Sequence, residues 1–303
     1  VGSEMCIRDR QELVNGSPST QVWVVDNASQ DGTAAMVAQE FPEIRLITSE
    51  KNLGFAGGNN AALRAMGFGQ PGTASEALPD VVLLLNPDTI IHSGALISLL
   101  AFLADMPGVG LVGPKLVYGD GSFQHSAFSF PGLWQLAIEL LPVPGRLVES
   151  RLNGRYPREW YEQGLPFQIG HPLGAALCAR REAIQAVGLL DEQYYMYAEE
   201  VDWSRRIVDA GWKAYCVPSA VVTHLGGQST GQIKINSFLN LWTSRYRFYR
   251  KYYSPLKVWT ARQIERLGME RKIRQEIQLP VAGHEERLAA YRRVINIWHE
   301  KPI

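Results

Sequence analysis

Two of the polar segments in this sequence have residue types that suit a divalent cation. Asp88 closes the tripeptide Asn86-Pro87-Asp88 after an apolar run, and His224 ends a later apolar run. A hard cation takes oxygen ligands, usually one or two carboxylates and several waters, and it neutralises phosphate charge. Simpler interpretations remain for each residue alone: Asp88 as the cap of a helix after Thr89, and His224 as a structural histidine.

A third segment offers groups for proton transfer. Glu199, Glu200 and Asp202 place three carboxylates within four residues, directly after an aromatic stretch. Like charges this close raise one another's pKa, which can prepare one of them as a general base. Asp202 and Arg206 are spaced to pair on one helix face. The helix dipole alone also favours acids in a first turn, but it does not explain the aromatic residues before them.

Two further segments could bind a nucleotide and its phosphates. Asp26 and Asn27 follow an apolar run, where a carboxylate can accept hydrogen bonds from a base or a ribose. The glycine-rich turn expected at Gly54–Asn60 lets backbone amides approach an anion. Both segments also fit ordinary structure, namely a helix start capped by Ser29 or Asp31 and a plain glycine turn.

The hydrophobic pattern predicts the elements that position these segments. Apolar runs predict strands at Gln21–Asp26, Ile44–Thr48, Val81–Leu85, Gly170–Arg180, Ala214–Val217 and Ala220–His224. Helices are predicted at Ala34–Phe41, Ala61–Met66, Gly94–Ala104, Arg181–Val187 and Tyr194–Ala210. Strands that alternate with helices argue for an α/β fold with a mostly parallel sheet. Ligands of such sheets bind beyond the carboxyl ends of the strands, where Asp26, Gly54–Asn59 and Asp88 all fall.

Composition limits the classes of protein that remain. The chain has 303 residues, of which 46% are hydrophobic, which suits one large α/β domain and an appendage. Its cysteines, Cys6, Cys178 and Cys216, have no metal-ligand or disulfide spacing, so we expect reduced thiols, as in a cytoplasm. No run has the roughly 20 apolar residues that span a bilayer. We also expect no signal peptide, because charged residues interrupt the first ten positions.

The C-terminal part of the sequence is basic. Leu241–Ile303 carries 14 Lys and Arg against 6 Asp and Glu. Arg245–Tyr253 mixes basic and aromatic residues, and such a segment can lie on an anionic membrane surface. An ordinary helix packed on the body is the equal alternative, and nucleic-acid binding is disfavoured because no binding motif accompanies the charge. We therefore expect an atypical or truncated start at 1–20, a main domain at 21–236 and a helical tail at 237–303.

Taken in order, the polar segments resemble the rhamnosyltransferase-like branch of family 2 glycosyltransferases, which have the GT-A fold. The matching stretches are VVDNASQDGT, NLGFAGGNN, LLLNPDT, GHPLGAALCARREAIQAVGLLDE, YMYAEEVDWSRRIVDAGW and HLGGQS. The resemblance implies an inverting transfer of a sugar from a nucleotide-diphosphate donor, with Mg²⁺ or Mn²⁺ on the diphosphate. It favours dTDP-rhamnose over UDP- and GDP-sugars. It also implies a glycan or lipid-linked acceptor, as in cell-wall or polysaccharide synthesis, at the inner face of the plasma membrane.

The resemblance implies roles for individual residues. The nucleotide and the donor would be bound by Asp26, Asn27, Asn52, Gly54, Gly58, Asn59 and Asn86. Asp88 would hold the metal, and His224 would lie beside the metal or the diphosphate. The family commonly has Glu-Asp where this chain has Glu199-Glu200. Glu200 is therefore the expected base, and Glu199 and Asp202 are the alternatives.

The start of the chain departs from the family pattern. The family opens with an apolar strand and a Thr-Tyr-Asn-like turn, and Val1–Arg10 shows neither. We therefore expect the first strand and helix to be missing. Two other functions stay open: a nucleotidyltransferase of similar architecture, and a non-catalytic remnant or scaffold. The remnant would keep any cellular role after Asp88→Ala or Glu200→Gln.

Overall fold

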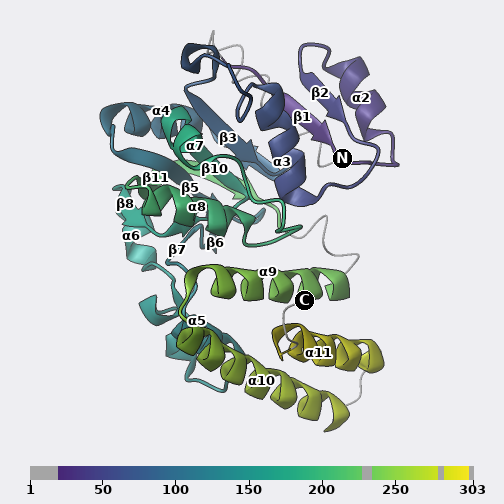
Figure 1. Cartoon of the computed structure of the whole chain (residues 1–303). Coiled ribbons are helices and arrows are strands. Elements are labelled where there is room, and N and C mark those ends of the chain that lie inside the picture. Colours follow the sequence, from purple (N-terminus) through teal and green to yellow (C-terminus); the bar gives the residue numbers. More distant parts are fainter. Residues whose placement is uncertain (1–19, 227–233, 279–282, 300–303) are drawn as a thin grey trace. The chain divides into compact units, whose positions relative to one another are not determined.

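A computed structural model describes residues 20–226, 234–278 and 283–299 (Figure 1). The predicted atypical start at 1–20 therefore lies outside the described residues, apart from Thr20. The chain forms two compact units. Of the described residues, the first holds 20–128, Arg158–Tyr195 and Glu199–Gly226, and the second holds Ser129–Pro157, Met196–Ala198, 234–278 and 283–299. The second unit thus includes a segment before residue 158 that the sequence did not link to the tail.

The first unit opens with a strand–helix–strand crossover. Strand β1 (Trp23–Asp26) pairs in parallel with β2 (Arg45–Thr48), and helix α2 (Thr33–Glu40) connects them (Figure 1). Val37 and Phe41 are buried against this pair. This crossover agrees with the strands and the helix predicted from the sequence, and it ends β1 on Asp26.

Seven other strands of the described chain form the main sheet of the first unit. Their order is β3-β10-β5-β11-β4, with β6 beside β5 and β8 beside β11. Their bounds are β3 Val81–Leu85, β4 Thr89–Ile91, β5 Val109–Val117, β6 Phe123–Gln124, β8 Phe167–Ile169, β10 Ala176–Arg180 and β11 Lys213–His224. The strands predicted at 214–217 and 220–224 are one strand, with an irregularity between Val217 and Val221.

The prediction of a mostly parallel sheet was wrong. Within the described main sheet only β5 and β11 pair in parallel, and the other pairs are antiparallel. Alternation of strands and helices predicts parallel pairing only where a crossover helix returns the chain in the same direction. Tight turns and the long insertion before β8 reverse the chain instead.

The strand ends that matter for the site nevertheless meet at one edge. β3, β5 and β11 run in the same direction, because two antiparallel steps through β10 restore the orientation. Asn86 follows β3 and His224 ends β11 at this edge. β4 pairs with the end of β11, so that Thr89 lies opposite His224.

Helix α3 (Gly54–Ala65) includes the segment that was predicted as a glycine turn, so that prediction was wrong. At Gly57 a side chain would not fit without a shift, whereas at Gly58 it would meet Asn27 at ordinary contact distance. A Cβ on Gly57 would lie 2.8 Å from the Leu53 Cβ, and one on Gly58 would lie 3.5 Å from the Asn27 amide nitrogen. The glycine content did not reveal the helical conformation of this segment.

The other helices of the first unit cover the main sheet. Leu99 and Leu103 of α4 (Ala95–Asp105) join a buried core with residues of β5, β10 and β11. Helix α8 (Glu199–Asp209) contacts β9 (His171–Pro172) and α7 (Arg181–Val187). The remaining short elements are η1 Ser75–Ala77, β7 Ala127–Phe128 and α6 Arg158–Glu162. This core makes the sheet edge a rigid base for polar side chains.

The second unit is helical, as predicted for the tail. It contains α5 Leu133–Leu140, η2 Gly145–Leu147, η3 Arg151–Asn153, α9 Lys234–Tyr252, α10 Pro255–Gln278 and α11 His284–His299. Trp242, Tyr249 and Trp298 are buried in its core. Gly268 lets α5 approach α10, because a Cβ there would lie 2.5 Å from that of Leu140. Among the described residues, no helix is long and apolar enough to cross a bilayer.

Candidate active site

Asn27 ties the end of β1 to the start of α3. Its side chain accepts a hydrogen bond from the Leu53 amide at 2.8 Å and donates to the Gly54 carbonyl at 3.0 Å and to Asn52 at 3.2 Å. Asn52 in turn accepts from the Gly54 amide at 2.9 Å. Both asparagines were predicted to bind the donor. In the structure their hydrogen bonds serve the scaffold, which fixes Asp26 beside α3.

Asp26 is buried, with 6% of the residue exposed. Its Oδ2 accepts a hydrogen bond from the Ser29 amide at 3.3 Å. Its Oδ1 is also buried, and it has no hydrogen-bond partner among the described residues. A buried carboxylate oxygen is costly when it lacks a donor. The geometry therefore fits a ligand that brings an N–H or O–H group to this oxygen.

The start of α3 is held against Tyr195. The Phe55 amide donates to the Tyr195 carbonyl at 3.1 Å. Gly54 has a φ of +71°, and a Cβ on it would lie 2.1 Å from the same carbonyl oxygen. Glycine is therefore required at position 54 both by backbone conformation and by space. This contact fixes the start of α3 against Tyr195 within the first unit.

Asn60, which the sequence analysis missed, makes the stronger connection from α3. The predicted residue Asn59 bonds a backbone carbonyl of its own helix. Asn60 is buried, donates to the Leu190 carbonyl at 2.9 Å and accepts from the Leu190 amide at 3.0 Å. Its spacing from Ala56 and Leu63 puts it on the buried face of the helix, and that spacing was the available signal.

Asp88 and His224 lie side by side at the edge of the main sheet. Asp88 Oδ1 is 3.4 Å from His224 Nε2, and the two side chains are only 14% and 13% exposed. The Leu225 amide donates to the Asp88 carbonyl at 2.9 Å, which fixes the turn against the end of β11. Asp88 does not cap a helix, because strand β4 follows it.

The Asp88–His224 pair fits a cation that arrives with a phosphate ligand. Within the described ranges, no group of three or more His, Cys, Asp or Glu gathers to hold a metal ion. One carboxylate and one imidazole leave most of an octahedral sphere to other oxygens. Diphosphate oxygens and waters can fill those positions, as is usual for Mg²⁺ with phosphate substrates. The donor set suits such shared coordination and is too small for a closed protein cage.

The neighbouring carboxylates of α8 differ in their surroundings. Glu199 is 5% exposed, and its Oε2 has no hydrogen-bond partner in the described part of the chain. Burial, together with the charge of Glu200, raises the pKa of Glu199 to about 9. Glu199 is therefore protonated near neutral pH and is a poor base there. Glu200 is half-buried.

Glu200 packs against Gly174, the residue before Ala175. A Cβ on Gly174 would be 3.3 Å from the Glu200 Cγ, so the absence of a side chain there makes room for Glu200. The next residue, Ala175, accepts a hydrogen bond from the Asn86 amide at 2.9 Å. The backbone at Gly174 and Ala175 therefore contacts both Glu200 and Asn86, the residue two positions before Asp88.

Asp202 has a structural contact that explains its burial. It is fully buried and pairs with Arg206 at 2.9 Å, which confirms the ion pair predicted from the spacing. Arg206 also donates to the carbonyls of Val187 and Leu189 at 2.7 and 2.8 Å. The pair therefore stabilises the turn after α7. Asp202 is accordingly not proposed as the general base.

We expect Glu199→Gln to stabilise the fold at alkaline pH. The raised pKa means that the folded state holds this proton more tightly than the unfolded chain does. Stability therefore falls as pH rises from about 4.5 toward about 9. Gln cannot ionise, so urea unfolding should show a gain over wild type near pH 9 that is absent near pH 4.5. An equal difference at both pH values would contradict the assigned cause.

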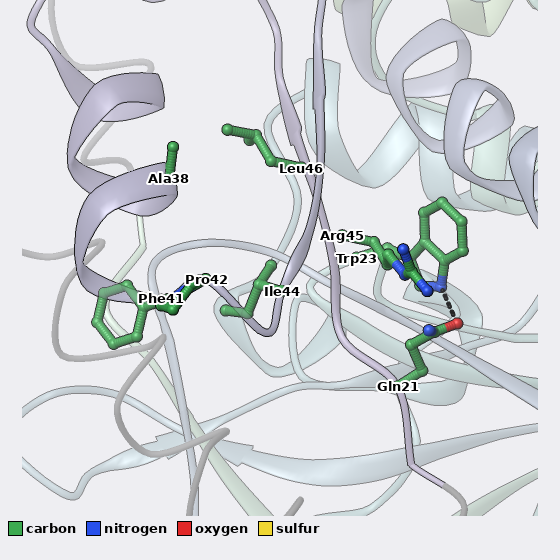
Figure 2. A pocket seen from close by; sticks show the side chains of 8 residues that line it. All are labelled: Gln21, Trp23, Ala38, Phe41, Pro42, Ile44, Arg45 and Leu46. Atoms are coloured by element: carbon green, nitrogen blue, oxygen red, sulfur yellow. Dashed lines mark hydrogen bonds between the residues drawn. The ribbon is translucent and has the colours of Figure 1, made fainter.

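A cavity of about 580 Å³ lies elsewhere in the first unit. It is lined by α2, β1 and β2 and the turn between helix and strand; Figure 2 shows Ala38 and Phe41 on one side and Arg45 and Trp23 on the other. Trp23 donates a hydrogen bond to Gln21 at 3.1 Å. None of the predicted site residues lines this cavity. The candidate site therefore rests on the sheet edge and not on the cavity.

Comparison with known sequences gives one family and several relatives. The family described as "Glycosyltransferase like family 2" matches residues 10–240. The N-acetylglucosaminyl-diphospho-decaprenol L-rhamnosyltransferase of Mycobacterium tuberculosis is 32% identical over 247 residues, which cover 80% of this chain and 79% of the relative. A low-salt glycan biosynthesis hexosyltransferase of Haloferax volcanii is 24% identical and covers 60% of this chain and 52% of its own.

Comparison with solved structures supports the fold. A mannosyltransferase from Pyrobaculum calidifontis in complex with GDP-Man and Mn²⁺ superposes with a TM-score of 0.52 at 15% identity, covering 98% of this chain and 80% of that one. GalNAc-T7 with UDP, GalNAc and Mn²⁺ gives 0.51 at 14% identity, covering 93% of this chain. This chain spans half the length of the GalNAc-T7 chain.

Proposed function

Because this chain belongs to glycosyltransferase family 2 and has the GT-A fold, we propose that it transfers rhamnose from dTDP-rhamnose to a lipid-linked glycan. That it is a nucleotide-sugar-dependent transferase follows from the family. The sugar and the acceptor are suggested by the Mycobacterium tuberculosis relative, whose name gives an L-rhamnosyl transfer to N-acetylglucosaminyl-diphospho-decaprenol. The observation that carries the proposal is the approach of Asp88 to His224 at the sheet edge.

Asp88 and His224 would hold Mg²⁺ or Mn²⁺ together with the donor diphosphate. A cation held there would supply positive charge that stabilises a nucleoside diphosphate as a leaving group. Asp26 would accept a hydrogen bond from the nucleotide through its buried Oδ1. Gly54 and Gly58 would act indirectly, by letting α3 pack against Tyr195 and Asn27.

Glu200 would act as the general base. It would take the proton of the acceptor hydroxyl while that oxygen forms a bond to the anomeric carbon. The bond between that carbon and the diphosphate oxygen breaks on the opposite face, so a single displacement inverts the configuration. Glu199, whose pKa burial raises to about 9, would stay neutral near neutral pH and leave Glu200 as the charged carboxylate.

Calorimetric titration of dTDP, UDP and GDP, each with Mn²⁺ or with EDTA, tests the donor assignment. We expect dTDP to bind most tightly and only when the cation is present. Preference for UDP or GDP would replace the proposed donor class while leaving the site intact. Absence of binding by the folded chain under all these conditions would contradict the proposed function.

We further propose that the helical unit touches the membrane that carries the acceptor, at its cytoplasmic face. The aromatic residues of 245–253 that first suggested this are mostly engaged, since Phe248 and Tyr249 are buried. Helix α10 instead exposes Leu256, Trp259 and Leu267, which are 73%, 59% and 55% exposed and share one helical face. Tryptophan beside basic residues favours the interfacial layer of an anionic bilayer.

Replacing Leu256 and Trp259 together by serine is expected to weaken binding to vesicles that contain anionic lipid by about tenfold, because two apolar side chains no longer leave water. Cosedimentation with the vesicles measures the change. Ile97→Ser is the matched control, because Ile97 is 71% exposed but lies on α4 of the first unit. Equal binding by wild type and the double variant would contradict this contact.

A further inference from the structure

Gln124 contacts the candidate metal ligand His224 from the opposite edge of its ring. The Gln124 amide nitrogen is 3.1 Å, and its oxygen 3.3 Å, from His224 Nδ1. The other ring nitrogen, Nε2, faces Asp88 Oδ1 at 3.4 Å. Each nitrogen of the imidazole therefore has its own neighbour, in a side chain that is only 13% exposed.

The sheet register produces this contact. Gln124 of β6 lies opposite Leu116 of β5, and Leu116 lies opposite Val222 of β11. Residues opposite one another share a face of a sheet, and so do residues two apart on one strand. Gln124, Val222 and His224 consequently project from the same face. Neighbouring strands, and not a loop, set the position of the amide relative to the imidazole.

An amide suits both neutral forms of the imidazole. With its proton on Nε2, His224 can donate to Asp88 while Nδ1 accepts from the Gln124 N–H. With its proton on Nδ1, His224 donates to the Gln124 oxygen, and the lone pair on Nε2 is left for a cation. Because an amide carries a donor and an acceptor, a half-turn of its plane changes one arrangement into the other.

We propose that Gln124 is a positioning residue that holds His224 in the form whose Nε2 binds the divalent cation. This inference rests on the proposed metal-assisted function. Metal-binding histidines commonly donate their second N–H to a neighbour that fixes both the tautomer and the ring orientation. Gln124 supplies that neighbour here, although the sequence analysis did not single it out.

Gln124→Leu tests the proposal, since leucine keeps the bulk but neither hydrogen-bonding group. Titration of Mn²⁺ in the presence of dTDP, followed by the electron paramagnetic resonance of free Mn²⁺, should show an affinity roughly 10–100-fold lower than wild type. Gln124→Glu retains an acceptor for the Nδ1 proton and is expected to recover most of the affinity. The ¹⁵N shifts of His224 with Mg²⁺ and dTDP should report a proton on Nδ1 in wild type that is lost from that site in the leucine variant.

Gln168→Leu is the matched control, because Gln168 is an exposed glutamine on β8 of the same sheet and should leave Mn²⁺ affinity unchanged. Wild-type Mn²⁺ affinity in a folded Gln124→Leu variant would overturn the positioning role of Gln124 and leave the proposed function unaffected. Equal losses in the leucine and glutamate variants would also overturn it. Failure of wild type itself to bind Mn²⁺ with dTDP would overturn both.

Discussion

Asp88→Ala is expected to abolish metal-dependent nucleotide binding and to lower the rate of sugar transfer by roughly 10²–10³-fold. The carboxylate is the only anionic group that the Asp88–His224 pair offers to a cation. The hydrogen bond that holds the turn is made by the Asp88 backbone carbonyl, which accepts it from the Leu225 amide. The substitution to alanine leaves this hydrogen bond in place. Calorimetry with dTDP and Mn²⁺, with a transfer assay alongside, measures both effects.

The control for this variant is Asp105→Ala. Asp105 is an exposed aspartate at the end of α4, and its loss should change neither nucleotide binding nor transfer. In a non-catalytic remnant or scaffold, Asp88→Ala and Asp105→Ala would not differ in nucleotide binding or transfer. Equal activity of Asp88→Ala and Asp105→Ala would therefore contradict the proposed metal site.

Glu200→Gln is expected to lower kcat by roughly 10²–10⁴-fold while leaving nucleotide affinity close to wild type. Glutamine keeps the size of the side chain and its contact with Gly174, but it cannot take the proton of the acceptor hydroxyl. Steady-state kinetics with separate kcat and KM values for the donor would show this division. A loss confined to KM would indicate a binding role instead.

The adjacent residue supplies the matched control. Burial raises the pKa of Glu199 to about 9, so this side chain already carries its proton near neutral pH. Glu199→Gln therefore mimics its normal charge and should retain far more activity than Glu200→Gln. The reverse order of activities would move the base to Glu199.

The sequence predicted most individual elements of the first unit because their apolar runs are local signals. β1, α2, β2, β3 and α7 lie close to their predicted ranges. Strand direction in the main sheet was not predictable in the same way. β10 pairs antiparallel with β3 and β5, which precede it by a long stretch of chain. The local sequence of Ala176–Arg180 does not determine whether this pairing is parallel or antiparallel.

The hydrogen bonds that hold the site together also could not be predicted from local sequence. Asn60 bonds Leu190 across 130 residues, and Gln124 meets His224 across 100 residues. Residue type alone could not separate Asn60 from Asn59, although the buried spacing of α3 could. Asn27 and Asn52 were expected at the ligand from the family resemblance. In the structure they bond each other and the helix start.

From the sequence alone, the aromatic residues of the tail could belong to a buried core or to an exposed membrane-binding face. The packing of the helices distinguishes the two. Trp242, Phe248 and Tyr249 are buried, whereas Trp259 is exposed. A sequence shows that such residues share a helix but not which face the neighbouring helices cover. The proposed membrane contact is therefore assigned to the exposed face of α10 and not to Arg245–Tyr253.

Incubating the chain with dTDP-rhamnose and an N-acetylglucosaminyl-diphospho-polyprenol, with Mn²⁺ or with EDTA, and analysing the lipid by mass spectrometry tests the proposed transfer itself. We expect a lipid product extended by rhamnose when Mn²⁺ is present, and none with EDTA or with Asp88→Ala. Transfer that proceeds equally with EDTA and in the Asp88→Ala variant would contradict the metal-assisted site at Asp88 and His224.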